Sequence, residues 1–297
     1  MPRPFAHHLV FGAGALGSWL GARLDPPAVL VTRGEHLRAL QHGPLRLAGL
    51  DDAEIPVTAR ARPPRLGPDA LVLVTVKTGQ LAAAARALRP ALAPDTVVAV
   101  LANGLHPDRD LADLLGRPVL RVVAEFGATL EAPGRVAFWG GRALVGRGRT
   151  EDRVAAALAA TGLPVERMDD PLRTAWEKLV MNCVANPLAG LTGLRNKEIA
   201  APRFHALRRA VAAEGMAVAA ACGVPLPDAL PDRIDAALAR SSNFNSMAQD
   251  MARGRVTEID ALNGLVVRLG EERGVAVPVN GLLADAVRLR TASARRR

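Results

Sequence analysis

A glycine-rich turn near the start of the chain constrains the fold more than any other feature. A short apolar run at residues 9–11 predicts a buried strand, and residues 16–24 predict a helix. Between them lies a G-x-G-x-x-G turn made of Gly12, Ala13, Gly14, Ala15, Leu16 and Gly17. The first glycine permits the tight turn, the second lets a pyrophosphate approach the backbone, and the third lets the helix pack on the strand. The turn therefore predicts a Rossmann-type dinucleotide-binding site, with the phosphates at the helix N-terminus.

The rest of the first half alternates apolar runs with alanine-rich stretches. Further strands are predicted at residues 29–32, 71–76 and 97–101, with a helix at 80–88. Residues 45–59 resemble a hairpin or an irregular excursion around Asp51 and Asp52. Strands near 119–124, 136–139 and 143–145 would extend the sheet. Strand–helix–strand order with short links predicts a doubly wound parallel sheet.

The second half of the chain shows helical patterns and little strand signal. Asp170 and Pro171 form a plausible helix start, with Asp as the cap and Pro at the first position. The helices are predicted at residues 172–185, 202–222, 231–240, 259–273 and 280–289. The predicted fold is thus α/β: a Rossmann-type, NADP-binding domain at residues 1–168, followed by an all-helical substrate and catalytic domain at residues 169–297.

Composition excludes several other classes of function. Aromatic residues make up only 3% of the 297 residues and there is no Tyr, which argues against a stacking surface for nucleic acid. Two cysteines cannot build a disulfide framework or a four-cysteine zinc site, and we expect no metal. No apolar run suits a signal peptide or a membrane span, so we expect a cytoplasmic protein without a membrane partner. A homodimer is kept as a candidate assembly.

The net charge of +9 comes almost entirely from arginine, because only three of the 38 basic residues are lysines. A compositional bias toward Arg explains most of this charge, and a site for anionic ligands is the functional alternative. A lysine in such a chain indicates a task that Arg cannot perform, such as releasing a proton near neutral pH. The second predicted strand is followed by Arg33, at the place where NAD-binding proteins carry an acidic residue. A guanidinium can pair with a 2′-phosphate, so Arg33 favours NADP, although an ordinary surface Arg remains the alternative.

Polar residues that could take part in binding or catalysis follow the predicted strands and line one predicted helix. Lys77 and Asn103 leave neighbouring strands at the carboxyl edge, where ligands bind in open parallel sheets. Lys178, Asn182 and Asn186 are spaced i, i+4 and i+8 among apolar residues, so they form a polar stripe on a buried helix. Burial lowers the pKa of a lysine and suits it to act as an acid, whereas a salt-bridged lysine in a bundle is the alternative.

A second polar segment lies between residues 242 and 260. Its Ser and Asn residues can cap a helix and can also present hydroxyl and amide groups to a carboxylate. Thr257 is predicted as an N-cap, with Glu258 in the first turn of the helix that follows.

These residues together resemble the ketopantoate reductase family (2-dehydropantoate 2-reductase) over nearly the whole chain. The matching segments are GAGALG at 12–17, Lys77, Asn103-Gly104, WEKLVMNCVANPL at 176–188, Asn196, NSMAQD at 245–250 and RVTEID at 255–260. The resemblance implies reduction of 2-dehydropantoate to pantoate by NADPH in pantothenate and coenzyme A biosynthesis, in a cleft between the two domains. Asn245 stands where Ser is common in the family, and residues 127–133 fit only loosely. These departures leave open which 2-keto acid is the substrate.

The resemblance also implies roles for individual residues. Lys178 matches the proton donor, and it acts with Asn182 and Glu258 in catalysis. Arg33, Lys77, Asn103, Glu258 and the glycine turn match cofactor contacts. The positions that match substrate contacts are Asn103, Lys178, Asn182, Asn186, Asn196, Asn243 and Ser246.

Other functions remain as alternatives at this stage. One is a reductase of another 2-keto acid, or another two-domain dehydrogenase acting on an opine, a polyol phosphate or a 3-hydroxy acid. A non-catalytic NADPH sensor is the alternative from a different class; it would keep the glycines and Arg33 but would not need Lys178.

Overall fold

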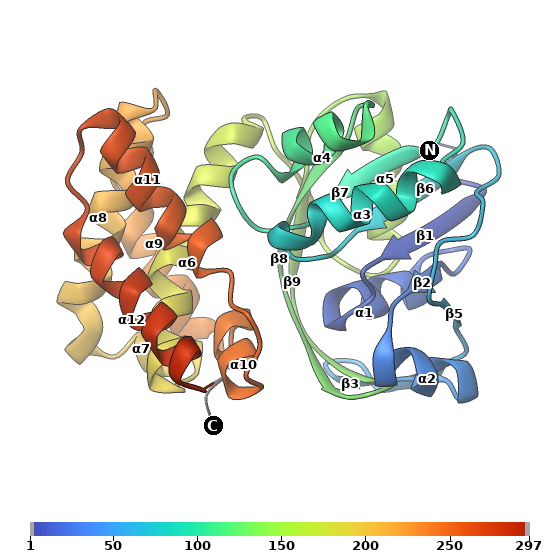
Figure 1. The fold of residues 1–297 in the computed structure, drawn as a ribbon, viewed down its shortest axis with the longest axis horizontal. Helices are drawn as coiled ribbons and strands as arrows, with labels where there is room; N and C mark the ends of the chain where they lie inside the picture. Colours follow the sequence, from blue (N-terminus) through green and yellow to red (C-terminus); the bar gives the residue numbers. More distant parts are fainter. Residues whose placement is uncertain (1–2, 295–297) are drawn as a thin grey trace. The chain divides into compact units, whose positions relative to one another are not determined.

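The computed structural model describes residues 3–294, which divide into two compact units. One unit ends at Pro171 and the other begins at Leu172. Figure 1 shows the first unit in colours from blue to yellow-green, and the second unit in colours that end in the red C-terminal helices.

The first unit is built around one ten-stranded sheet. Its strands are β1 His7–Phe11, β2 Val29–Val31, β3 Leu45–Gly49, β4 Ala53–Ile55, β5 Thr58–Arg60, β6 Ala70–Val74, β7 Val97–Val100, β8 Leu120–Ala132, β9 Arg135–Val145 and β10 Val165–Arg167. The order β5-β2-β1-β6-β7-β8 is parallel throughout and is the strand order of a Rossmann fold. The predicted fold class is therefore confirmed.

Helices cover both faces of the parallel part of this sheet. They are α1 Ala15–Arg23, α2 Gly34–His42, α3 Leu81–Leu88, α4 Pro107–Leu115 and α5 Arg149–Ala159. Alternate residues of β6 point to opposite faces, so Val72 and Val74 pack with α3 and α4, while Leu71 and Leu73 join the core under α1, α2 and α5. Burial on both faces explains why this strand reads as a continuous apolar run.

A long antiparallel hairpin differs from the sequence expectation. The two short strands expected at 136–139 and 143–145 are one strand, β9, paired with β8. Gly140 and Gly141 interrupt the pattern in the sequence, yet both have positive φ and stay within the strand. A Cβ on Gly141 would lie 2.1 Å from the Glu125 carbonyl oxygen, so only glycine fits this close approach of the two strands. The excursion at 45–59 contains a hairpin, β3–β4, as predicted, and then β5, which returns to pair with β2.

The second unit is helical. It contains α6 Pro171–Thr192, α7 Asn196–Ile199, α8 His205–Ala221, α9 Leu230–Arg240, α10 Ser246–Ala252, α11 Asn263–Arg273 and α12 Pro278–Ala294, with short 3₁₀ turns at Pro202–Phe204 and Ile259–Ala261. Within residues 3–294 no helix is both long and apolar enough to span a bilayer.

Several helix boundaries differ from the predictions, and those of α6 and α11 bear on the site. Helix α6 begins at Pro171 as predicted, but it continues beyond residue 185 and through Pro187 to Thr192. Helix α11 begins at Asn263, and Thr257 caps no helix, because Glu258 directly precedes the 3₁₀ turn at Ile259–Ala261. The N-cap prediction for Thr257 was therefore wrong.

Candidate functional site

The carboxyl ends of four parallel strands meet at one edge of the first unit. Phe11 of β1 is in register with Val31 of β2 and Val74 of β6, and Val74 is in register with Val100 of β7. The segments that follow these strands carry the glycine turn, Arg33, Lys77 and Asn103. The structure therefore brings the sequence-predicted residues of this unit to one edge of the sheet, the edge where open α/β sheets bind ligands.

The glycine turn has the geometry that its residue types require. Gly12 has a φ of +93°, and a Cβ there would lie 2.4 Å from the Val76 side chain. A Cβ on Gly17 would lie 2.4 Å from Thr75 Oγ1. By contrast, a Cβ on Gly14 would meet nothing closer than the Gly12 carbonyl oxygen at 3.9 Å. Two glycines are thus required by contacts within the protein, whereas the space beside Gly14 is open.

The start of α1 is also suited to a phosphate. Gly14 is the N-cap, no side chain caps the helix, and the first turn contains no acidic residue. The first backbone N–H groups of α1 therefore have no competing anion from the helix itself, and the helix dipole places positive charge there. Open space beside Gly14 together with an uncapped helix N-terminus fits a dinucleotide pyrophosphate.

Arg33 occupies the position next to α2. It is exposed, and it is the N-cap residue of that helix, directly after β2. Thr32 N–H donates to the Arg60 carbonyl oxygen at 3.1 Å, so β5 supports the backbone beside Arg33.

The turn that carries Asn103 is held by its backbone. Thr78 Oγ1 donates to the Asn103 carbonyl oxygen at 2.5 Å. The Arg121 guanidinium donates to the next two carbonyl oxygens, those of Gly104 (2.6 Å) and Leu105. Three successive carbonyl groups are thereby fixed, which holds the backbone at Asn103 in place. The sequence analysis missed Arg121, and nothing in its local pattern distinguishes it from other arginines of this Arg-rich chain.

Ser18 and His36 support the glycine turn from inside the first unit, and the sequence analysis missed both. Ser18 Oγ donates to the Ala13 carbonyl oxygen at 3.2 Å and lies 2.9 Å from His36 Nε2. Both side chains are buried, so this contact belongs to the interior beneath the turn.

In the second unit, the polar stripe lies on α6 as predicted. Lys178 and Asn182 are half-buried, and Asn186 is 4% exposed. The neighbouring residues Leu179, Val180 and Cys183 are fully buried, and burial raises the pKa of the Cys183 thiol, which keeps it protonated. The stripe is therefore polar among the apolar residues that separate its members on α6.

An asparagine network joins the end of this stripe to the Ser and Asn segment. Asn245 Oδ1 accepts from Ala248 N–H and so caps α10. Asn245 Nδ2 donates to the Ala185 carbonyl oxygen of α6 at 3.0 Å and to Asn196 Oδ1 at 3.1 Å. Asn196 Nδ2 in turn donates to Ser241 Oγ and to Asn243 Oδ1. The structure thus brings Asn196, Asn243 and α10 together beside α6.

The remaining predicted residues of this unit occupy different environments. Ser246 is exposed at the first position of α10, and Glu258 is half-buried before the 3₁₀ turn. Ser241 and Asn245 were not predicted as site residues, although the serine and asparagine content of the segment was the relevant signal.

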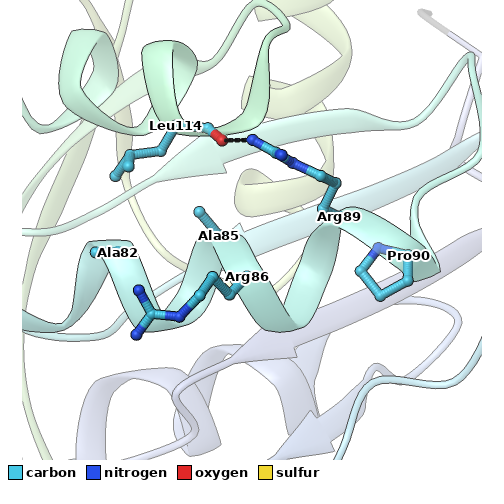
Figure 2. Close-up of a pocket in the computed structure, with 6 residues that line it drawn as sticks. All are labelled: Ala82, Ala85, Arg86, Arg89, Pro90 and Leu114. Atoms are coloured by element: carbon cyan, nitrogen blue, oxygen red, sulfur yellow. Dashed lines mark hydrogen bonds between the residues drawn. The ribbon is translucent and has the colours of Figure 1, made fainter.

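A shallow depression of about 430 Å³ lies elsewhere on the first unit, between α3 and α4. Figure 2 shows its lining residues, with Arg89 donating to the Leu114 carbonyl oxygen across it. Arg89 directly follows the C-terminal end of α3, and Leu114 lies near the C-terminal end of α4, whereas Lys77 and Asn103 precede these helices. No predicted site residue lines the depression. We assign it no function.

The strand order and the glycine turn define a Rossmann-type α/β protein with an additional helical unit. Residues 8–149 match the family model for ketopantoate reductase PanE/ApbA, and residues 170–291 match the model for the C-terminal part of the same family. This chain belongs to the ketopantoate reductase family.

Individual relatives agree with this assignment. The 2-dehydropantoate 2-reductase of Archaeoglobus fulgidus is 36% identical over 290 residues, which cover 94% of this chain and 96% of the relative. The crystal structure of a PanE/ApbA family ketopantoate reductase from Ralstonia eutropha JMP134 has a TM-score of 0.88 at 33% identity and covers 97% of this chain and 99% of that chain. A D-mandelate dehydrogenase structure with NADH and anilino(oxo)acetate has a TM-score of 0.87 at 22% identity, with coverage of 97% and 99%, and so shares the fold.

Proposed function

We propose that this protein reduces 2-dehydropantoate to pantoate, with NADPH as the reductant. The observation that carries the proposal is the stripe of Lys178, Asn182 and Asn186 on α6, in a chain that belongs to the ketopantoate reductase family. The names of relatives such as that of Archaeoglobus fulgidus support the same reaction.

The first unit would hold the cofactor. The open space at Gly14 and the uncapped start of α1 fit the pyrophosphate, and Arg33 would pair with the 2′-phosphate that distinguishes NADPH from NADH. Lys77 and Asn103, at the same edge of the sheet, would bind the remainder of the cofactor. When bound, the nicotinamide supplies the hydride for the keto carbon of the substrate.

Lys178 is the proposed proton donor. Reduction of a ketone places negative charge on its oxygen, and a lysine Nζ can hydrogen-bond to that oxygen and then transfer a proton to it. Asn182 and Asn186, one and two turns further along α6, would orient Lys178 and bind substrate oxygens through their amide groups.

Ser246 and Asn243 are proposed to hold the substrate carboxylate, and Asn196 to support Asn243. Ser246 is exposed, and a hydroxyl at the first position of a helix can donate to an anion. Asn196 uses its Nδ2 group on Ser241 and Asn243, so its contribution is to fix the position of Asn243. Glu258 is proposed to accept hydrogen bonds from hydroxyl groups of substrate and cofactor.

The decisive experiment measures the rate of NADPH oxidation with 2-dehydropantoate, 2-ketoisovalerate, pyruvate and phenylglyoxylate. We expect the highest kcat/KM with 2-dehydropantoate. Preference for another acid of the set would identify a different 2-keto acid reductase. NADPH binding without turnover of any of the four would favour a non-catalytic sensor and contradict the proposal.

A further inference from the structure

Helix α6 contains a proline at a position that removes one of its backbone hydrogen bonds. In a regular helix the N–H of residue 187 would donate to the carbonyl group of residue 183, but Pro187 has no N–H. Cys183 is fully buried, so water cannot replace the missing donor. Cys183 lies between Asn182 and Asn186 along the chain, so the interruption falls within the proposed catalytic segment.

Asn263 supplies the missing donor. It is the first residue of α11 and is fully buried, and its Nδ2 atom lies 3.1 Å from the Cys183 carbonyl oxygen. A side chain on another helix thereby replaces the hydrogen bond that Pro187 cannot make.

The orientation of the Asn263 amide follows from a chain of hydrogen bonds that starts at Glu214. The Glu214 carboxylate accepts from the backbone N–H groups of Val279 and Asn280 at the start of α12, and also from Asn280 Nδ2 at 2.8 Å. With its NH₂ group turned to Glu214, Asn280 presents Oδ1 to Asn263, whose Nδ2 donates to it at 2.9 Å. The second hydrogen of Asn263 Nδ2 is then directed to the Cys183 carbonyl.

This arrangement leaves another polar atom unsatisfied. Asn263 Oδ1 is buried and has no hydrogen-bond partner among the described residues. An unpaired buried acceptor lowers the stability of the folded protein. The Asn263 amide nevertheless has the orientation in which both hydrogens of Nδ2 are donated, one to Asn280 and one to Cys183.

From these contacts we propose that Asn263 is a positioning residue for the reaction. It fixes α6 at the interrupted hydrogen bond and so sets the relative placement of Lys178, Asn182 and Asn186. This inference rests on the proposed function for its catalytic consequence. Its structural part can be tested without any substrate.

The structural test is an NMR measurement of the Cys183 carbonyl carbon. The chain has two cysteines; Cys183 is followed by Val184, and Cys222 is followed by Gly223. Carbonyl-¹³C cysteine combined with ¹⁵N-valine therefore gives one carbonyl–amide correlation, from Cys183, and ¹⁵N-glycine gives the corresponding signal from Cys222 as a control. Loss of a hydrogen bond shields a carbonyl carbon, so Asn263→Ala should move the Cys183 signal upfield and leave the Cys222 signal in place.

The catalytic test is a double-mutant cycle with Pro187. Asn263→Ala should lower kcat about 10- to 100-fold, since small displacements of catalytic groups have effects of this size, while the Kd for NADPH is unchanged. Pro187→Ala restores the backbone N–H. In that background the Asn263→Ala substitution should cost less than about threefold, because the two changes act on the same carbonyl group. Val266→Ala removes apolar burial from the same helix and is the control for general loss of stability.

The outcomes separate this inference from the proposed function. No turnover by the unaltered protein contradicts the proposed function, and the NMR result still decides whether Asn263 binds Cys183. Where the unaltered protein is active, either of two results overturns the inference. One is a Cys183 signal that does not move in Asn263→Ala, and the other is an equal loss of kcat from Asn263→Ala with Pro187 and with Ala at position 187. If Asn263→Ala alone does not fold, the double variant decides: its recovery supports the role of Asn263, and its failure to fold overturns it.

Discussion

His36 Nε2 lies 2.9 Å from Ser18 Oγ, and this is one of two hydrogen bonds that the buried ring makes. On the other side of the ring, Nδ1 accepts from the Gly134 backbone N–H at 3.0 Å, so the proton of the neutral imidazole is on Nε2. Ser18 Oγ accepts that proton and donates its own to the Ala13 carbonyl oxygen. A neutral histidine thus links the β8–β9 hairpin turn to the glycine turn.

This link predicts how the stability of the protein depends on pH. Burial lowers the pKa of His36 from its ordinary value of 6.5, so the unfolded chain binds more protons than the folded protein below about pH 6.5. Stability should be fully present above that pH and should fall as the pH decreases, by at most about 1.4 kcal/mol per pH unit for this group. Urea unfolding from pH 8 to pH 5 measures the slope.

The matching variant is His36→Gln, which cannot titrate and should reduce the slope. His8 has a pKa lowered by burial as well, and it should contribute a slope of the same sign that His36→Gln leaves in place. An unchanged slope in His36→Gln would show that His36 remains protonated to the same extent in both states.

The glycine turn predicts opposite outcomes for two valine substitutions. Gly14→Val should abolish binding of NADPH and leave the melting temperature nearly unchanged, because the space at Gly14 is open in the protein and would be filled by the pyrophosphate. Gly17→Val should instead unfold or strongly destabilise the first unit, since its Cβ would lie 2.4 Å from Thr75 Oγ1 and 2.9 Å from Val10 Cγ1. Calorimetry and fluorescence titration distinguish the two. Retained NADPH affinity in Gly14→Val would place the cofactor elsewhere.

Arg33 is predicted to discriminate between the two nicotinamide cofactors. Arg33→Ala should weaken NADPH binding by about 1.5–3 kcal/mol, tenfold or more in Kd, and should leave NADH binding nearly unchanged. Arg38→Ala is the control, because Arg38 is an exposed arginine on the same helix. Equal weakening of both cofactors in Arg33→Ala would remove Arg33 as the discriminator.

Lys178 is predicted to be required for proton transfer. Lys178→Ala should lower kcat roughly 10²–10⁴-fold without changing the Kd for NADPH or the melting temperature. Lys178→Arg should not restore activity, because the pKa of a guanidinium lies far above neutral and the group releases its proton poorly. Lys197→Ala is the matched control, since Lys197 is an exposed lysine of the same unit. A folded Lys178→Ala protein with near-normal kcat would contradict the role of Lys178.

The sequence was sufficient for the parallel strands and the glycine turn because these features are local and periodic. The apolar run of β6 and the i, i+4, i+8 spacing on α6 were both visible in the chain. The continuation of α6 through Pro187 could not be predicted, because proline usually ends a helix. The compensating donor, Asn263, lies on a helix that is far away in the sequence. Contacts between residues far apart in the chain, such as those of Arg121 with the Asn103 turn, leave no periodic pattern.

The asparagine network beside α6 has a consequence for how this protein can change. Asn196, Ser241, Asn243 and Asn245 share their hydrogen bonds, so removing any one of them takes a partner from at least one of the others. Effects of substitutions within such a group are not additive, with coupling energies of about 0.5–3 kcal/mol. Single alanine substitutions alone would therefore not separate a residue that touches a substrate from one that supports it. Laboratory evolution of the substrate preference would need to change these positions in concert rather than one at a time.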